Sequence, residues 1–417
     1  MKTNIWIMNH YAGGMFFDQG GRHYNFAKYL RRAGYAPVVF CANSKHGRAE
    51  RFLETDALWE ERIAEEIDTP FVFVKARTYT GNGKQRVLNM VDFYRNVQKA
   101  AVEYAAKHGK PDVIYASSVH PLTLVAGIRL AKRFGVKCIC EVRDLWPESI
   151  VAYSSRFTKK NPLIRLLYQG EKWIYKKADA MIFTMEGAYD YIAEQGWDKE
   201  IPRSKVHHIN NGVDLELFDY NKEHFRVEDP ELDDPEVFKV IYTGSVRRVN
   251  NLGLLLDAAK CVKDSRVKFL IWGDGDEREA LEQRVRDEKI ANVEFKGRVE
   301  KKYVPSIVSR SDLNLVHWEQ APLLKYGVSY NKLFEYLAAG RPVFSTVCTR
   351  YSILEKYGCG MDTEGFAPAE LAAGIDRMAA LPADERLHMG ENARAAAVDF
   401  DFAVLTKKLE KIMEECV

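Results

Sequence analysis

The sequence has 417 residues, more than one hydrophobic core usually holds, so we expect two domains of about 200 residues each. Its 61 basic side chains nearly balance 59 acidic ones, and 47% of the residues are hydrophobic. This composition excludes a disordered chain and a nucleic-acid binder that works through strong net charge.

The sequence has no apolar run of the roughly 18 residues that a membrane-spanning helix needs. It begins MKTNIWIMNH, which lacks the long apolar core of a signal peptide. We therefore expect a cytoplasmic protein. The seven cysteines are odd in number and form no C-x-x-C pair, which argues against a disulfide framework and a zinc site.

Short β-branched runs alternate with amphipathic helical stretches, a pattern typical of doubly wound parallel sheets with helices on both faces. In the first half we expect strands at 3–9, 36–42, 71–75, 112–117, 136–142, 179–184 and 205–209. A linker rich in acids and turn formers follows at 210–236. Its Asp229-Pro230 and Asp234-Pro235 pairs argue against regular structure there.

The second half repeats the α/β pattern. Strands are expected at 237–243, 266–272, 292–296, 312–316 and 342–346, and helices near 252–263, 276–289, 302–310, 331–339 and 368–380. The last stretch is helical in pattern but follows no strand, so we expect it to pack across the domains. The predicted domains are 1–209 and 210–383, with helices of 384–417 crossing back towards the first.

Ligands of such sheets bind beyond the carboxyl ends of the strands, so the loops after the strands are the candidate sites. After the first strand, a loop that contains Gly13-Gly14 and Gly20-Gly21 opens into a helix. Glycines let a phosphate approach the backbone, and a helix amino terminus favours a diphosphate. No strict phosphate-binding fingerprint is present, so two glycine turns before an ordinary helix explain these residues equally well.

His120 follows the strand at 112–117, at a junction with a helix. Histidine titrates near neutral pH, so on this loop it can donate a hydrogen bond to a substrate hydroxyl or take a proton. The alternative is a capping histidine without a chemical task.

The next strand runs into CEVRDLWPES, which places Glu141, Asp144 and Glu148 around Trp146. Carboxylates accept hydrogen bonds from sugar hydroxyls, and an indole stacks on the apolar face of a sugar. The alternative is an internal salt-bridged loop, which Arg143 supports equally well.

A basic amphipathic segment follows at 155–179. It either lies on an anionic membrane surface, at the cytoplasmic face, or packs against the sheet with its lysines solvated. Its basic and apolar residues are Arg156, Lys159, Lys160, Arg165, Lys172, Lys176 and Lys177, with Leu163, Leu166, Leu167, Trp173 and Ile174.

In the second half, Gly244 and Ser245 turn tightly after the first strand, and Arg247 and Arg248 follow. Arginines beside a glycine turn suit a diphosphate through charge and bidentate geometry.

The second strand of this half ends at Gly273, Asp274 and Gly275. The glycines permit close approach, and Asp274 with Asp276 matches an Asp-x-Asp metal pattern. Asp276 also reads simply as part of the acidic first turn of the next helix, so we expect no metal.

A third segment, KYGVSYNKLFEYLAAGRPV, sets Ser329, Asn331 and Lys332 at a helix start and Glu335 one turn later. The alternative for Ser329 or Asn331 is a helix cap without a binding role. Glu335 can bridge two ribose hydroxyls, because a carboxylate accepts two hydrogen bonds at once.

Together these segments resemble the family 4 glycosyltransferases, retaining enzymes of the GT-B fold with two Rossmann-like domains facing a central cleft. The resemblance covers essentially the whole chain and rests on YTGS, WGDGDEREALE, NGVD at 211–214, NVEFKGRV at 292–299 and FEYLAAGRPV at 334–343. EVRDLWPES and RHYNFAKYL resemble a subgroup that builds bacterial surface polysaccharides, often on a lipid-linked acceptor.

The resemblance implies that the second domain holds a nucleotide-sugar donor, the first holds a glycan or lipid-linked glycan acceptor, and neither a metal nor another cofactor is needed. Glu335 would hold the ribose, and His120 the donor sugar or the transferring centre, with Asp144 as a third catalytic candidate. The expected donor-binding residues are Gly20, Gly21, Gly244, Ser245, Arg247, Arg248, Gly273, Asp274, Gly275, Ser329, Asn331 and Lys332.

Two departures from the family pattern stand out. The first of its two usual glutamates is replaced by Gly327, so Lys332 or backbone N–H groups near Ser329 would serve instead. The usual phosphate-clamping arginine and lysine are replaced by Ser245 and Asn250, with Arg247 and Arg248 as substitutes. The rival interpretations are a nucleotide-sugar epimerase on the same scaffold and a non-catalytic nucleotide-sugar-binding subunit.

Overall fold

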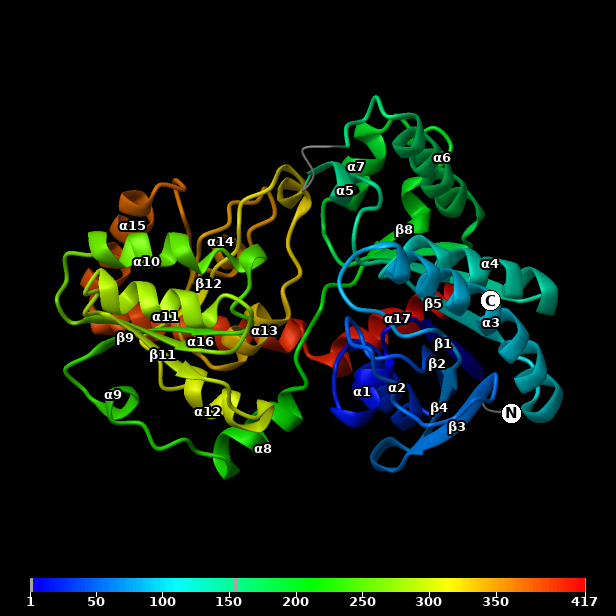
Figure 1. Ribbon diagram of the computed structural model, residues 1–417, viewed down its shortest axis with the longest axis horizontal. Coiled ribbons are helices and arrows are strands. Elements are labelled where there is room, and N and C mark those ends of the chain that lie inside the picture. Colours follow the sequence, from blue (N-terminus) through cyan, green and yellow to red (C-terminus); the bar gives the residue numbers. More distant parts are fainter. Residues whose placement is uncertain (1–2, 153–156, 417) are drawn as a thin grey trace. The chain divides into compact units, whose positions relative to one another are not determined.

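The computed structural model describes residues 3–152 and 157–416. The chain divides into two compact units, Met1–Asn210 with Leu405–Val417, and Asn211–Val404 (Figure 1). The predicted boundary at 209/210 lies one residue from the division seen here. The final crossing begins later than the predicted 384, because α16 (Ala383–Asp399) packs on α13 (Asn331–Ala338) of the second unit.

Within the described residues, the first unit contains an eight-stranded sheet of order β3-β4-β2-β1-β5-β6-β7-β8. All neighbours are parallel except β3 and β4. The strands are β1 (Asn4–Asn9), β2 (Ala36–Ala42), β3 (Trp59–Ala64), β4 (Thr69–Val74), β5 (Val113–Ser117), β6 (Lys137–Val142), β7 (Ala180–Phe183) and β8 (Val206–His208). The predicted strands are confirmed, and β3 was missed.

The helices of this unit fill the connections between its strands. They are α1 (Gly13–Phe17), α2 (Arg22–Arg32), η1 (Glu65–Ile67), α3 (Lys84–His108), α4 (Pro121–Phe134), α5 (Glu148–Ala152), α6 (Pro162–Lys177), α7 (Ala188–Glu194), η2 (Arg203–Lys205) and the end of α17 (Phe402–Cys416).

The second unit contains a parallel six-stranded sheet of order β11-β10-β9-β12-β13-β14 within the described residues. Its strands are β9 (Phe238–Thr243), β10 (Val267–Trp272), β11 (Val293–Gly297), β12 (Leu313–Val316), β13 (Val343–Ser345) and β14 (Gly360–Asp362). Its remaining helices are α8 (Leu215–His224), α9 (Pro230–Asp233), η3 (Arg248–Asn250), α10 (Leu252–Cys261), α11 (Arg278–Asp287), η4 (Lys301–Tyr303), α12 (Val304–Val308), η5 (Pro322–Tyr326), α14 (Ile353–Tyr357) and α15 (Pro368–Ala380).

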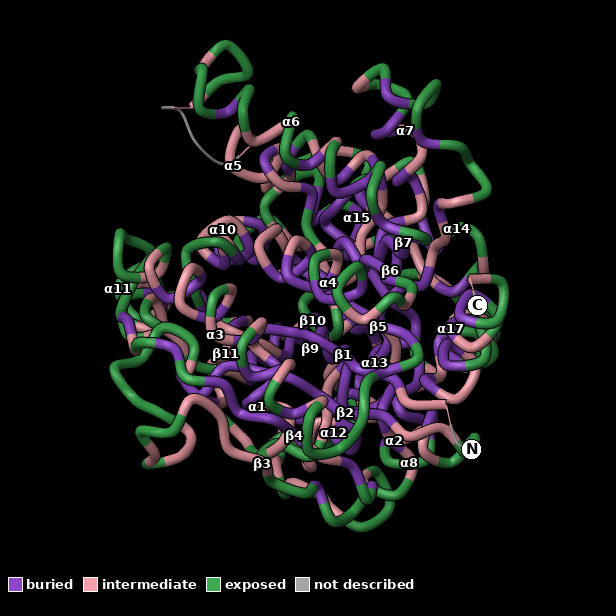
Figure 2. The backbone as a smooth tube through the Cα atoms, turned by 90° about the vertical axis from the view of Figure 1, so that its right-hand side faces the viewer, coloured by how far each residue is buried: buried purple, intermediate pink, exposed green. Residues whose placement is uncertain are grey.

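The strands form because their sequences are nearly continuous apolar runs, as expected for parallel strands covered on both faces. Every residue of β9 and β5 is buried, and Figure 2 shows buried strands inside layers whose outer helical turns are exposed. Because all strands except β3 run parallel within their sheet, their carboxyl ends lie at one edge, and the candidate residues follow those ends.

The predicted irregular linker at 210–236 contains two helices, so that expectation was wrong. Asp214 and Asp229 precede α8 and α9, and each carboxylate accepts a hydrogen bond from a backbone N–H three residues later. The aspartate before Pro230 is therefore a helix cap with proline in the first turn, a pattern as typical of a helix start as of a loop.

Candidate functional site

Two histidines meet at the carboxyl ends of β1 and β5. His120 follows β5 as the N-cap residue of α4, but its side chain makes no capping hydrogen bond. Its Nε2 lies 2.6 Å from Nδ1 of His10, which directly follows β1, and both residues are buried. The ring of His120 therefore contacts His10 and makes no side-chain capping bond to α4, and its chemical task stays a prediction.

Burial controls the charge of this pair. It lowers the pKa of His120 to about 3, helped by the charge of Arg86. It also lowers the pKa of His10 well below the usual value, together with repulsion from His120. Both rings are thus neutral at neutral pH, and the shared contact joins an N–H donor to a bare nitrogen. Nδ1 of His120 has no hydrogen-bond partner among the described residues.

The first unit also has a cavity of about 540 Å³, whose lining residues do not include His10 or His120. Tyr11, whose ring centroid lies 4.6 Å from that of His10, lines it. The Tyr79 hydroxyl donates to Tyr11 at 3.2 Å and contacts Nδ1 of His46 at 2.5 Å. The cavity is lined by Tyr11, Gly14, Phe17, Asp18, Ser44, Lys45, His46, Arg48 and Phe52. It combines aromatic rings with charged groups, a composition suited to a sugar.

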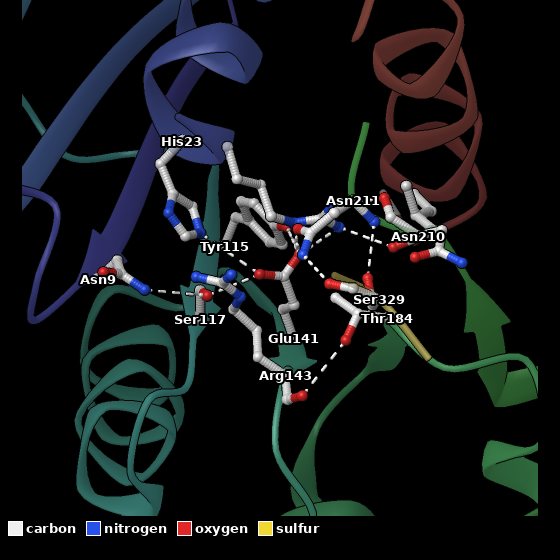
Figure 3. A network of polar contacts seen from close by, with 12 residues as sticks. Asn9, His23, Tyr115, Ser117, Glu141, Arg143, Thr184, Asn210, Asn211 and Ser329 are labelled. Atoms are coloured by element: carbon white, nitrogen blue, oxygen red, sulfur yellow. Dashed lines mark hydrogen bonds and ion pairs between the residues drawn. The ribbon is translucent and has the colours of Figure 1, made fainter. Parts of the chain in front are cut away.

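Glu141, at the end of β6, is the centre of a buried hydrogen-bond network (Figure 3). Its Oε2 accepts from Nε of Arg22 at 2.7 Å and from the hydroxyl of Tyr115, and its Oε1 accepts from Ser117 at 2.7 Å. Nε2 of His23 lies 3.3 Å from Oε1. Burial alone would raise the pKa of Glu141, but Arg22 and His23 hold it well below the usual value.

Both carboxylate oxygens of Glu141 are therefore occupied, and the predicted sugar contact through this residue is wrong. The loop is internally salt-bridged, but its cation is Arg22 from α2 rather than Arg143. Arg22 also donates to the carbonyls of Ile209 and Asn210, so it links α2 to the residues that follow β8.

Asp144 and Trp146 remain on the loop after β6. Asp144 is exposed and makes no ion pair within the described residues, and both residues line a small cavity together with the buried Glu171. Gly20 and Gly21 precede α2, and Gly21 is its N-cap with a φ of 99°. Contact of any of these residues with a substrate stays a prediction.

In the second unit, two glycine loops lie backbone to backbone. A Cβ on Gly273 would lie 1.8 Å from the carbonyl oxygen of Gly244, and a Cβ on Gly275 would lie 2.0 Å from that of Val246. Val246 also donates its N–H to Asp274. These two glycines are thus required by the packing of β9 and β10 loops against each other, a reason that the sequence did not show.

Lys332 places a buried cation beside these loops. Its Nζ lies 3.9 Å from the ring centroid of Tyr242 and 2.8 Å from where a Cβ of Gly244 would be. Nζ has no hydrogen-bond partner among the described residues. Burial lowers the pKa of Lys332 to about 7, against the attraction of Glu335.

Glu335 lies one turn after Lys332 on α13. It is partly exposed, and its carboxylate has no hydrogen bond or ion pair within the described residues. Asn331, the first residue of α13, is exposed. The helix thus presents an unused carboxylate and an unused buried ammonium on the same side.

The residues in place of the usual phosphate clamp contact each other. Ser245 donates its hydroxyl hydrogen to Oδ1 of Asn250 at 2.8 Å, and Asn250 is buried. Arg247 and Arg248 are exposed and make no ion pair within the described residues. Lys332 is therefore the buried cation next to this loop.

The loop before α13 has a structural task. Ser329 accepts a hydrogen bond from the N–H of Asn211 at its hydroxyl, and another from Nδ2 of Asn211 at its carbonyl. Tyr330, not Ser329 or Asn331, is the N-cap of α13, so both predicted capping roles are wrong. Gly327 has a φ of 108°, where a glutamate would be strained, which explains the missing carboxylate.

Sequence reasoning also missed His317, which follows β12. Its Nδ1 contacts Oγ1 of Thr346 at 2.8 Å and its Nε2 contacts the carbonyl of Asn251 at 2.9 Å. Burial lowers its pKa to about 4, with a further contribution from Lys332. Among residues 3–152 and 157–416, no group of three or more His, Cys, Asp or Glu side chains is arranged to hold a metal ion.

Comparison with known proteins agrees with this architecture. The model of the family described as Glycosyltransferase Family 4 matches residues 22–217, and that described as Glycosyl transferases group 1 matches residues 237–380. The putative teichuronic acid biosynthesis glycosyltransferase TuaH of Bacillus subtilis is 27% identical over 259 residues. That match spans 59% of this chain and 59% of the relative.

Solved structures share the whole fold. Sucrose-phosphate synthase of Thermosynechococcus elongatus has a TM-score of 0.73 at 18% identity, covering 99% of both chains. Anabaena Alr3699/HepE in complex with UDP-glucose has a TM-score of 0.62 at 15% identity, again covering 99% of both. With the two family models covering most of its length, the chain belongs to the glycosyltransferases, with a family 4 first half and a group 1 second half on the GT-B fold.

Proposed function

We propose that this glycosyltransferase moves a sugar from a nucleoside-diphosphate sugar to a hydroxyl of a glycan or lipid-linked glycan in polysaccharide biosynthesis, with retention of the anomeric configuration. The observation that carries the proposal is the pair of unused charges on α13, the buried Nζ of Lys332 and the carboxylate of Glu335. A buried ammonium without a partner is costly, and a ligand that supplies a negative charge removes the cost.

The donor would bind at the ends of β9 and β10. Lys332 would neutralise the diphosphate beside Gly244, in place of the basic residues that Ser245 and Asn250 replace. Glu335 would accept hydrogen bonds from two ribose hydroxyls. A preorganised cation at the leaving group acts where charge develops in the transition state, which is usually the largest catalytic contribution.

The acceptor would bind in the first unit, in the cavity beside Tyr11. The neutral pair of His10 and His120 would offer an N–H or a bare nitrogen to a sugar hydroxyl without adding charge. Asp144, exposed on the loop after β6, would accept from a further hydroxyl.

The transfer is one substitution at the anomeric carbon. The bond between this carbon and the β-phosphate oxygen breaks, and its electron pair stays on the diphosphate. The acceptor oxygen bonds to the same carbon on the same face, and its proton goes to the released diphosphate. We expect the chain to need no metal or other cofactor, since Lys332 and the helix amino termini would neutralise the leaving group.

Two relatives support the donor class and the setting. Anabaena Alr3699/HepE was solved with UDP-glucose, and TuaH is described as a teichuronic acid biosynthesis glycosyltransferase. No comparison favours an epimerase or a binding subunit.

The test is release of nucleoside diphosphate from a panel of nucleotide sugars, with and without glycan acceptors, followed by NMR of the product anomer. Acceptor-dependent release with the donor's configuration supports the proposal. Isomerised donor without release, or binding without turnover, contradicts it.

Variants assign the residues. His120→Ala and Glu335→Ala should each lower kcat/KM about a hundredfold or more, because each removes a group that contacts the reacting sugar or the ribose. The matched controls His388→Ala and Glu391→Ala alter the same residue types on the exposed side of α16 and should leave kcat/KM unchanged.

A further inference from the structure

Helix α6 carries an apolar stripe that the fold does not use. Leu163, Leu166 and Trp173 expose 56%, 62% and 40% of their surface. Their spacings of three and seven residues set them along one side of the helix. Exposed large apolar groups in a contiguous row mark a contact surface, whereas single ones are ordinary.

The opposite side of α6 already fixes the helix to its unit. Ile164, Ile174 and Tyr175 are buried there. Glu171 is buried as well, and its two oxygens accept hydrogen bonds from Tyr175 at 2.6 Å and Tyr191 at 2.7 Å. Figure 1 shows α6 at the margin of the first unit, next to α7. The apolar stripe is therefore not needed to hold the helix in place.

Basic side chains border the apolar stripe. Lys160, Arg165 and Lys177 make no ion pair within the described residues, so their charge is uncompensated. Lys172 and Lys176 share Glu200, and Lys159 pairs with Glu148. Arg165, Lys172 and Lys176 recur at spacings of seven and four, which puts them on one flank of the stripe. Arg156, which we included in this segment, lies outside the described residues.

We propose that the exposed face of α6 docks on the surface of an anionic lipid bilayer, with the apolar stripe among the acyl chains and the flanking cations at the headgroups. Charge complementarity favours an anionic bilayer, because an apolar stripe with a cationic border is the pattern of a helix that lies in a membrane interface. Among the described residues, no helix is long and apolar enough to cross a bilayer. The docking is peripheral and is independent of the proposed reaction.

The experiment is co-sedimentation of the full chain with vesicles of phosphatidylcholine alone or of phosphatidylcholine with about 30% anionic phosphatidylglycerol. We expect pelleting with the anionic vesicles only. Arg165→Glu/Lys177→Glu should weaken the partitioning at least about tenfold, since each basic residue contributes a several-fold effect near such a surface. Leu163→Ser/Leu166→Ser should weaken it about tenfold through lost apolar burial.

Matched controls show whether an effect is specific to the exposed face of α6 or follows from any equal change in net charge or hydrophobicity. Lys407→Glu/Lys408→Glu makes the same charge change on exposed positions of α17, and Leu387→Ser/Val398→Ser makes the same polar change on exposed positions of α16. Both controls should pellet as the unaltered protein does. Thermal melts of all four variants should coincide, because every altered side chain is exposed.

Quenching of Trp173 provides a second readout. Bromine-labelled lipids should quench part of the tryptophan emission, and Trp173→Phe should abolish that part. Binding without such quenching, or binding that survives the Leu163→Ser/Leu166→Ser change, would show that the stripe does not enter the bilayer. Absence of pelleting with anionic vesicles, or equal losses in the control variants, would overturn the proposal and leave the stripe to a protein partner.

Discussion

Two buried charged groups, Glu141 at the end of β6 in the first unit and the Lys332 ammonium on α13 in the second, differ in how they are compensated. Both oxygens of Glu141 accept hydrogen bonds, from Arg22, Tyr115 and Ser117. Nζ of Lys332 has no hydrogen-bond partner among the described residues. The first charge stabilises the fold it belongs to, whereas the second lacks a counter-charge that a substrate can bring.

The largest effect is expected at Glu141. Glu141→Ala removes the carboxylate that balances the charge of buried Arg22, so it should lower the free energy of unfolding of the first unit by about 3–5 kcal/mol. Urea denaturation followed by tryptophan fluorescence measures this loss. Turnover per folded molecule should stay near normal at low temperature. If the Glu141→Ala protein were folded and stable but inactive, Glu141 would serve catalysis rather than the fold, which contradicts the comparison with Lys332.

Lys332→Met tests the opposite expectation. Without the cation, kcat/KM should fall by about 10²–10³, the range seen when one preorganised group at a developing charge is removed. The melting temperature should not fall, because the buried ammonium has no hydrogen bond or ion pair to lose among the described residues. Lys239 is the matched control, since its buried Nζ pairs with Asp312 at 3.1 Å. Lys239→Met should lower the melting temperature and leave kcat/KM unchanged.

The charge state of Lys332 gives a pH dependence. With its pKa lowered to about 7, the free side chain loses its proton as the pH rises above that value. Affinity for the nucleoside diphosphate should then weaken about tenfold per pH unit above pH 8, which calorimetric titration measures. His317, whose pKa burial lowers to about 4, stays neutral over this range.

The same shift affects stability in the other direction. The unfolded chain keeps the lysine proton up to about pH 10, whereas the folded chain releases it near pH 7, so stability from this group rises with pH between those values. Lys332→Met should lose both the pH dependence of diphosphate affinity and the pH dependence of stability. If either pH dependence persists in this variant, a group other than Lys332 causes it.

The smallest effect is expected at Arg247 and Arg248. Both are exposed, so solvent screens them, and Arg247→Gln or Arg248→Gln should weaken donor binding only about two- to fivefold. The measurement is the dissociation constant at low and high salt, where the loss should shrink as salt rises. A hundredfold loss from either variant would make that arginine, rather than Lys332, the diphosphate cation.

Much of the fold was predictable because its strands are apolar on both faces. Residues 36–42 and 237–243 have the continuous apolar runs of covered parallel strands, and the structure has strands there. β3 was missed because WEERIA carries charges at positions that an edge strand leaves exposed. Its pairing depends on β4 rather than on its own sequence.

The candidate sites were only partly predictable. His120, Lys332 and Glu335 stood out because they follow strands or begin a helix. His10 was missed although it directly follows β1, because its candidate role depends on the contact with His120, which is 110 residues away in the sequence. The contacts of Arg22 with Glu141 and of Ser329 with Asn211 likewise join segments that nothing local links.

The alternation of strands and helices along the chain and the basic, amphipathic character of α6 follow from the sequence itself, because period and composition are local properties. The order of the strands in each sheet and the packing of the two glycine loops against each other do not. Which charged side chains are paired is likewise decided by the tertiary structure. Glu141 is compensated and Lys332 is not because side chains from distant segments either reach them or do not, and only the folded chain decides that.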